Sequence, residues 1–279
     1  IIFSKYMAAL SSSISYLLPE NLTKSFFLNS GAEAVEAAIK VCFRSYKSKK
    51  KFILFSDKSY HGKLIGSGSI SGSYRKDNQF PEMENCENFN FNDPIDLEKR
   101  VIECEKKGGV YSVIIEPFSA SLLQACSNTF MNKLFELKRK YRFKIIFDEV
   151  FTGFFKSKKM FYFQNFIDLV PDIICLSKTL GGGKSSISCL VIDDKTYNDA
   201  YGKINETFLH TTTYNGFGEE SVTALAALNI LSRNDFQKKV ESLSNLISLK
   251  LKELQLKHSK KIQQIKGNGI LNGIIFKSF

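Results

Sequence analysis

Five short runs of apolar residues recur along the chain, and helix-like segments separate most of them. The runs are KFILFS at 51–56, YSVIIEP at 111–117, FKIIFDEV at 143–150, PDIICLS at 171–177 and ISCLVID at 187–193. Strands that are apolar on both faces and joined by helical crossovers are typical of a mostly parallel sheet covered by helices. We therefore expect an α/β fold with a mostly parallel central sheet flanked by helices, in which ligands bind beyond the carboxyl ends of the strands.

Helical periodicity is present at residues 31–47, 129–142, 219–233 and 235–261. The segment 76–98, rich in asparagine and acidic residues, is expected to be a surface excursion. The closing stretch GILNGIIFKSF reads as a strand that stops without a partner, and the sequence opens on Ile1 rather than Met. We therefore expect a fragment that lacks both ends of a longer protein.

The net charge of +11 comes mostly from lysine, because the chain contains only six arginines. Proteins that bind nucleic acids usually cluster arginines with aromatic platforms, so we expect no nucleic-acid partner. The lysine run KSKKK at 47–51 reads as a solvated loop. No uncharged apolar stretch reaches the roughly 18 residues that a membrane span needs, so no membrane association is expected.

The six cysteines include no C-x-x-C pair, and no histidine lies near them at metal-ligand spacing. The sequence therefore predicts no metal site. Cys42 and Cys175 lie within apolar runs, where a reduced and packed thiol is the simplest interpretation. This cysteine usage favours a cytoplasmic location.

The stretch CLSKTLGGG at 175–183 places Lys178 between an apolar run and three glycines. The following GGGKSS resembles a phosphate-binding loop, but the pattern G-x-x-x-x-G-K-[ST] requires glycine at the position of Lys178. A strand also follows where that loop needs a helix. We instead expect Lys178 to be desolvated at a strand end, where it could lose its proton and attack a carbonyl, and Lys184 to be a surface residue.

Two other stretches contain groups suited to holding an anion and a flat ring. Ser30 and Glu33 in NSGAEAVEAAIK match a capping box, and a capped helix start with a small-residue loop can bind an anion. Tyr60 and His61 follow the strand at 51–56, where a flat aromatic could lie over a ligand. The glycines at 66, 68 and 72 miss the dinucleotide-binding spacing.

Two acids, Asp148 and Glu149, end the apolar run at 143–150. Successive strand side chains point to opposite faces, so only one of these acids can reach a given site. A structural salt bridge and a magnesium ligand are alternative roles for such an acid. A cofactor bonded to Lys178 as an imine would account for the helix start, the aromatic, the acid and the lysine together.

Six motifs occur in an order that resembles the class III aminotransferases, which are pyridoxal-phosphate (PLP) enzymes of fold type I. They are FFLNSGAEAVEAAIK, SYHGKLIGSGSISG, VIIEP, IIFDEVFTGF, PDIICLSKTLGGG and FLHTTTYNG, spread over about residues 10 to 277. The resemblance implies a PLP-binding large domain at 1–230, incomplete at its N-terminus. It also implies that 231–279 holds the linking helix and first strand of a small C-terminal α/β domain, and that the protein is a homodimer with shared active sites.

The resemblance assigns a role to each matching residue. Lys178 would bond the cofactor and later shuttle protons, and Asp148 would pair with the pyridine nitrogen. The remaining cofactor contacts would be Val150 under the ring, Tyr60 over it, Ser30, Gly31 and Ala32 in the phosphate loop, and Thr213 on the phosphate of the neighbouring subunit's cofactor.

The sequence departs from the family pattern at three places. The pattern E-P-x-x-G-E-G-G reads EPFSASLL, so Ser121 replaces the second glutamate. The pattern GFGRTG reads GFFKSK, and GNP is degraded to GFGEE. The change at Ser121 argues against the ornithine and γ-aminobutyrate specificities.

The function expected from this resemblance is PLP-dependent transamination, from an amino acid or amine donor to a keto acid, ketone or aldehyde acceptor. A PLP-dependent aminomutase of the glutamate-1-semialdehyde type, a racemase, or a catalytically incomplete fragment are alternatives. A nucleotide-binding protein that uses GGGKSS is a remote one.

Overall fold

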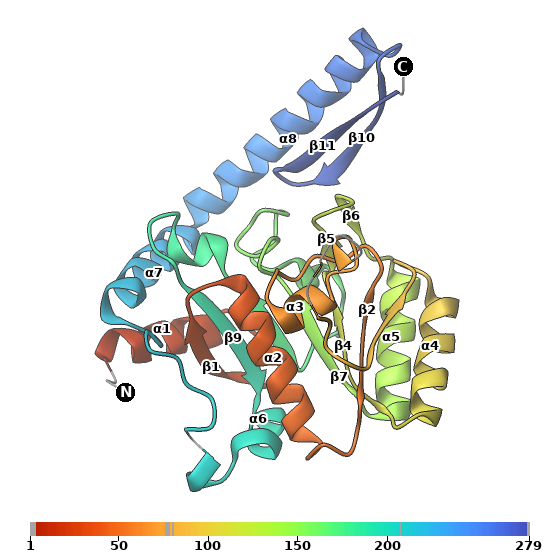
Figure 1. Cartoon of the computed structure of the whole chain (residues 1–279). Helices are drawn as coiled ribbons and strands as arrows, with labels where there is room; N and C mark the ends of the chain where they lie inside the picture. The colour runs from red at the N-terminus through yellow and green to blue at the C-terminus, as the bar shows by residue number, and fades with distance from the viewer. Residues whose placement is uncertain (1–3, 76–78, 80, 207, 278–279) are drawn as a thin grey trace.

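A seven-stranded sheet forms the centre of the computed structural model, which describes residues 4–75, 79, 81–206 and 208–277. The sheet order is β1-β9-β8-β7-β4-β2-β3 (Figure 1). The strands are β1 (Leu22–Leu28), β2 (Phe52–Ser56), β3 (Cys86–Phe89), β4 (Val110–Ile115), β7 (Lys144–Asp148), β8 (Ile173–Leu176) and β9 (Ser188–Asp193). β9 runs antiparallel to both β8 and β1, and the pairs from β8 to β3 are parallel. The expected α/β class with a mostly parallel sheet is confirmed.

Helices cover both faces of this sheet, because alternate side chains of the central strands point to opposite sides. Ile145 and Phe147 of β7 pack in the larger core cluster, whereas Ile146 packs in the other. The helices that share the larger cluster are α1 (Lys5–Tyr16), α4 (Pro94–Lys106), α5 (Asn128–Tyr141) and α7 (Gly218–Leu231). The opposite cluster contains α2 (Gly31–Ser45) and α6 (Asp194–Tyr201). The parallel strands are therefore buried from both sides.

The five predicted strands and four predicted helices are all present, but the segment 76–98 differs from its prediction. Residues 76–78 and 80 of this segment lie outside the described residues. Further along, β3 pairs in parallel with β2, and α4 begins at Pro94 with Asp93 as its N-cap. These residues belong to the sheet domain and are not a surface excursion, because Phe89 and Leu97 are buried in the core.

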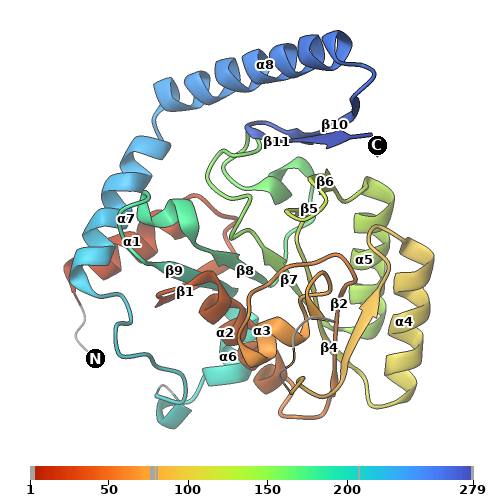
Figure 2. The same ribbon diagram turned by 45° about the horizontal axis from the view of Figure 1, so that its top comes forward.

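The C-terminal part of the described chain consists of a long helix and a hairpin that project from the sheet domain (Figures 1 and 2). Helix α8 (Asn234–Lys257) leads to β10 (Ile262–Asn268), which pairs antiparallel with β11 (Leu271–Phe276). The prediction of a closing strand without a partner is therefore wrong. The partner strand was missed because its sequence, IQQIKGN, is mostly polar. The domain division at 230/231 falls at the end of α7 and stays a prediction, and residues 1–3, 278 and 279 lie outside the described residues.

The hairpin and α8 contact the turn at residues 154–158, which we call the strap. Ile270 N donates a hydrogen bond to Lys156 O (2.9 Å), and Lys158 Nζ donates to Asn245 Oδ1 of α8 (3.1 Å). Phe155 lies edge-on to Phe236 of α8, with ring centroids 6.4 Å apart. The strap is therefore held from the C-terminal side of the chain.

Two strap residues adopt left-handed backbone angles at places where the family pattern GFGRTG has glycine. Phe155 has φ 63° and Lys158 has φ 72°. Leu123, at a glycine position of E-P-x-x-G-E-G-G, has φ 50°. Side chains disfavour this conformation by roughly 1–2 kcal/mol per residue, so these turns carry backbone strain that glycine would not.

The six cysteines are all free and buried, which agrees with the interpretation of packed, reduced thiols. Among the described residues, no helix combines the length and the hydrophobicity that crossing a membrane requires.

Candidate active site

A cavity of about 350 Å³ lies beyond the carboxyl ends of β2, β4, β7 and β8. The residues that follow these strands supply its walls, as expected for a parallel sheet. Its lining contains Gly31, Ala32, Tyr60, His61, Gly62, Lys63, Leu64, Glu116, Ala120, Asp148, Val150, Phe151, Ser177 and Lys178. Six of the eight predicted site residues are therefore brought together: Gly31, Ala32, Tyr60, Asp148, Val150 and Lys178.

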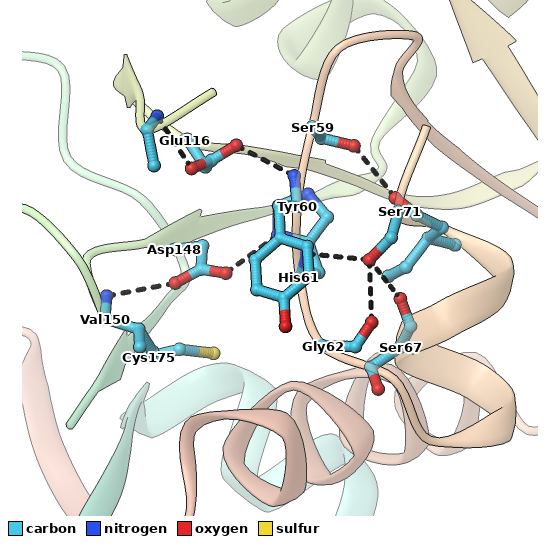
Figure 3. A network of polar contacts seen from close by, with 12 residues as sticks. Ser59, Tyr60, His61, Gly62, Ser67, Ser71, Glu116, Asp148, Val150 and Cys175 are labelled. Carbon is cyan, nitrogen blue, oxygen red and sulfur yellow. Dashed lines mark hydrogen bonds and ion pairs between the residues drawn. The ribbon is translucent and has the colours of Figure 1, made fainter. Parts of the chain in front are cut away.

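The buried carboxylate of Asp148 is paired with His61 (Figure 3). His61 Nδ1 lies 2.7 Å from Asp148 Oδ2, and the two side chains are 0% and 5% exposed. The other carboxylate oxygen, Oδ1, accepts a hydrogen bond from Val150 N (3.0 Å). His61 N donates to Ser71 Oγ (2.8 Å), which fixes the loop that carries the imidazole. The partnership of His61 with Asp148 was missed because the sequence shows only a lone histidine beside a tyrosine.

The start of α2 borders the cavity and packs tightly against it. Ser30 caps the helix and exchanges hydrogen bonds with Glu33, so the predicted capping box is confirmed. Gly31 and Ala32 line the cavity, whereas Ser30 is absent from the lining and uses its hydroxyl in the cap. A Cβ at Gly31 would lie 2.7 Å from Val150 Cγ1, so a larger residue would displace this wall. The first turn of a helix has N–H groups without helical partners, which suit an anion.

Lys178 lies at the rim of the cavity and not in a desolvated position. It is exposed, and it begins the 3₁₀ helix η3 (Lys178–Gly181) with φ 48°. Its Nζ lies 4.9 Å from the ring centroid of Phe151. The prediction of a buried lysine is therefore wrong for this chain, because the left-handed turn after β8 takes Lys178 out of the buried strand. Lys184 is exposed, as expected.

A second lysine approaches the same aromatic ring from the strap. Lys156 Nζ lies 5.7 Å from the Phe151 ring centroid and donates a hydrogen bond to Phe151 O (2.8 Å). Burial, and after it the charge of Lys178, lower the pKa of Lys156 to about 8 against the opposing attraction of Glu149. Two amines therefore flank Phe151, one half-buried and one exposed.

Glu116 is a cavity residue that was not predicted as a site residue, although it lies in the VIIEP motif. Its carboxylate accepts hydrogen bonds from Tyr60 N and Ala120 N, each at 3.0 Å. The pKa of Glu116 is raised to about 7, chiefly by burial, with His61 opposing the rise and Asp148 adding to it. Its position at a strand's carboxyl end is the signal that could have identified it.

Glu149 points away from the cavity, as the alternation of strand side chains requires. Its Oε1 accepts a hydrogen bond from Phe163 N (2.7 Å), and its Oε2 accepts one from the Thr152 hydroxyl. Burial raises the pKa of Glu149 to about 7. Backbone and hydroxyl donors hold this acid, in place of the salt bridge considered from the sequence.

Thr213 lies apart from the Lys178 cavity. It borders a different hollow, formed by Ser4 and residues 211–219. Thr213 and the neighbouring Tyr214 are both exposed. The described chain therefore does not bring Thr213 to its own cavity.

In the described part of the chain, no group of three or more His, Cys, Asp or Glu residues could hold a metal ion.

Comparisons with known proteins agree with this arrangement. A family model described as aminotransferase class-III matches residues 1–278. A structure titled "Transaminase with L-ala" is 23% identical with a TM-score of 0.90, covering 99% of this chain and 70% of that one. A taurine:2-oxoglutarate aminotransferase from Bifidobacterium kashiwanohense, in complex with PLP and glutamate, is 21% identical with a TM-score of 0.88, covering 99% and 65%.

A third solved structure is an adenosylmethionine-8-amino-7-oxononanoate aminotransferase from Methanocaldococcus jannaschii. It is 26% identical, with a TM-score of 0.86, and the match covers 99% of this chain and 66% of that chain. The chain thus spans about two thirds of the length of the structures that it matches.

Proposed function

This chain belongs to the class III aminotransferase family, whose members depend on PLP, and on that premise we propose that the protein transfers amino groups at the Lys178 cavity. The donor would be an amino acid or amine, and the acceptor a keto acid, ketone or aldehyde. The observation that carries the proposal is that one cavity collects Lys178, Asp148, Tyr60 and the start of α2. Lys178 offers an amine that can bond the cofactor, and Asp148 a partner for its ring nitrogen. Tyr60 offers a surface for the face of the ring, and the start of α2 a site for the phosphate.

The residues present fit PLP. Gly31 and Gly62 leave no room for side chains against Val150 and Ala32, so this wall presents backbone, as a phosphate site requires. The buried carboxylate of Asp148, paired with His61, is suited to a cationic ring nitrogen. When bound, PLP supplies an electron sink for the carbon that loses its proton.

The chain's own residues would hold and orient that group. We propose that Lys178 Nζ bonds the cofactor and afterwards carries the proton, since this amine lines the cavity and is exposed to it. Asp148 would keep the ring nitrogen protonated, with Val150 and Tyr60 on its two faces. Gly31 and Ala32, with the Ser30 cap behind them, would bind the phosphate.

We also propose a homodimer in which Thr213 reaches the phosphate of the partner's cofactor. Its exposure, and its separation from the cavity of its own chain, support this role. The six free cysteines support a cytoplasmic location, because thiols stay reduced there.

The test is the covalent bond at Lys178. We expect the protein to develop a near-visible absorbance band with added PLP, and borohydride to abolish this band and leave the label on the peptide that contains Lys178. Lys178→Ala should lack both the band and the label, whereas Lys184→Ala, an exposed lysine nearby, should keep them. A wild-type protein that gives neither band nor label would refute the proposal. Amino transfer between separate donor and acceptor molecules then distinguishes transamination from an aminomutase, which needs a single substrate.

A further inference from the structure

Three buried titratable groups meet at the inner end of the cavity: Asp148, His61 and Glu116 (Figure 3). The side chains of His61 and Asp148 are almost fully buried, and Glu116 is 6% exposed. Asp148 engages His61 Nδ1, whereas the buried His61 Nε2 has no hydrogen-bond partner among the described residues. Asp148 therefore holds the imidazole directly, whereas the charges of His61 and Asp148 act on the buried Glu116 carboxyl without a hydrogen bond to it.

Glu116 joins the two loops that form this end of the cavity. Its Oε2 accepts a hydrogen bond from Tyr60 N, and its Oε1 accepts one from Ala120 N. Tyr60 directly precedes His61, so the Glu116 carboxylate positions the segment that supplies both the tyrosine ring and the imidazole. The thiol of Cys126 donates to the backbone oxygen of Glu116, with a sulfur–oxygen distance of 3.6 Å.

The charges that face Glu116 act in opposite directions. Burial is the largest influence and raises the pKa of Glu116, the attraction of His61 lowers it, and the repulsion of Asp148 raises it, with a net value of about 7. The hydrogen bonds from Ala120 N and Tyr60 N favour the ionised form. Glu116 is thus partly protonated near neutral pH, and its protonation responds to the charge at Asp148.

We propose that Glu116 is a positioning residue whose charge is coupled to the cofactor ring, so that Glu116 releases a proton when a protonated pyridine ring binds beside Asp148. The inference rests on the cofactor site proposed above. A ring cation next to Asp148 offsets the negative charge that disfavours ionised Glu116. The Glu116 carboxyl then loses its proton to the buffer through the cavity that it lines.

Linkage fixes the sign of the resulting pH dependence. If ring binding favours ionised Glu116, then ionised Glu116 must favour ring binding by the same factor. Ring affinity should therefore rise with pH and level off only once Glu116 is ionised in the unliganded protein, more than about one pH unit above its pKa of about 7. Each unit by which the ring lowers the pKa of Glu116 corresponds to about a tenfold gain in affinity.

Proton release can be measured without any chemistry at Lys178. The probe is 4′-deoxypyridoxine 5′-phosphate, which has the ring and the phosphate but no aldehyde to bond to a lysine. Titration calorimetry in two buffers of different ionisation enthalpy gives the number of protons exchanged on binding. At pH 6.5–7 we expect wild type to release more protons than Glu116→Gln, and we expect its affinity to rise more steeply between pH 6 and 7.5.

Glu149→Gln is the matched control. Glu149 is also buried, with its pKa raised to about 7, but it points away from the cavity, and the repulsion of Asp148 is the smallest of the influences on its pKa, so its replacement should change the proton count less than Glu116→Gln does. Equal proton counts for wild type and Glu116→Gln would overturn the inference, while the Lys178 band would still support the proposed function. Failure of wild type to bind the probe would overturn it as well.

If the Glu116→Gln variant does not fold, a measurement on wild type alone still tests the inference. With ¹³C-labelled glutamate carboxyls, the probe should shift one buried signal toward its ionised position at pH 6.5. Unchanged carboxyl signals in the presence of bound probe would contradict the proposed coupling.

Discussion

Replacing Glu149 by glutamine should stabilise the protein at alkaline pH. Glu149 is fully buried, and burial raises its pKa from 4.5 to about 7. The folded state therefore holds a proton that the unfolded state has released between these two values, and stability falls as pH rises through this range. Each pKa unit corresponds to about 1.4 kcal/mol, so ionisation of Glu149 destabilises the fold by roughly 3 kcal/mol above pH 7.

Glutamine preserves the contacts of Glu149 while removing its charge. Its carbonyl can accept the hydrogen bond from Phe163 N, and its amide can donate to the Thr152 hydroxyl. The variant should be close to wild type in stability at pH 5. Its advantage in the free energy of unfolding should grow by roughly 2–3 kcal/mol between pH 5 and pH 8.

Urea denaturation at several pH values measures this difference directly. Glu82→Gln serves as a control, because the pKa of Glu82 is shifted in the opposite direction: the hydrogen bond from Arg75 lowers it. That exposed pair should contribute little, and its loss should give no gain in stability at pH 8. A Glu149→Gln advantage that stays constant with pH, or that reverses, would refute the reasoning.

Three further substitutions test the strained strap and the tight cavity wall. Lys158→Gly should raise the free energy of unfolding by about 0.5–1 kcal/mol in urea denaturation, because relief of the left-handed backbone at φ 72° outweighs loss of the exposed hydrogen bond to Asn245. Lys159→Gly, at an exposed neighbour outside the left-handed region, should instead lower it by about 0.5–1 kcal/mol. Gly31→Ala should weaken PLP binding by about tenfold in an absorbance titration, because overpacking of 1–3 kcal/mol must move Val150 or the start of α2. Unchanged PLP affinity would show that this wall is free to adjust.

The buried strands were predictable because their sequences are apolar on both faces. β7 and β8 can be predicted from their own residues alone, since parallel strands covered by helices must bury both faces. β1 and β3 lie at the two edges of the sheet and contain polar residues such as Lys24 and Glu87. Their pairing depends on neighbours that are distant in the sequence, which residue patterns do not reveal.

The site was predictable as a set of groups that serve one cofactor, but not in the contacts between them. The spacing around Lys178 and the position of Asp148 at a strand end indicated chemistry, and both line the cavity. The contact between His61 and Asp148 joins residues of different loops, so only the fold reveals it. The exposure of Lys178 depends on a left-handed turn at a non-glycine residue, which sequence preferences disfavour.

The link between the strap and the C-terminal hairpin has a consequence for the order of folding. The bond from Ile270 N to Lys156 O joins segments that leave the ribosome far apart in time. Domains begin to fold from the N-terminal side during synthesis, so the sheet and the cavity walls can form before β10 and β11 exist. The strap, whose left-handed turns lack glycine, gains this support last. Lys156, whose amine approaches Phe151 from the strap, thus gains its backbone partner Ile270 only after the cavity walls can have formed.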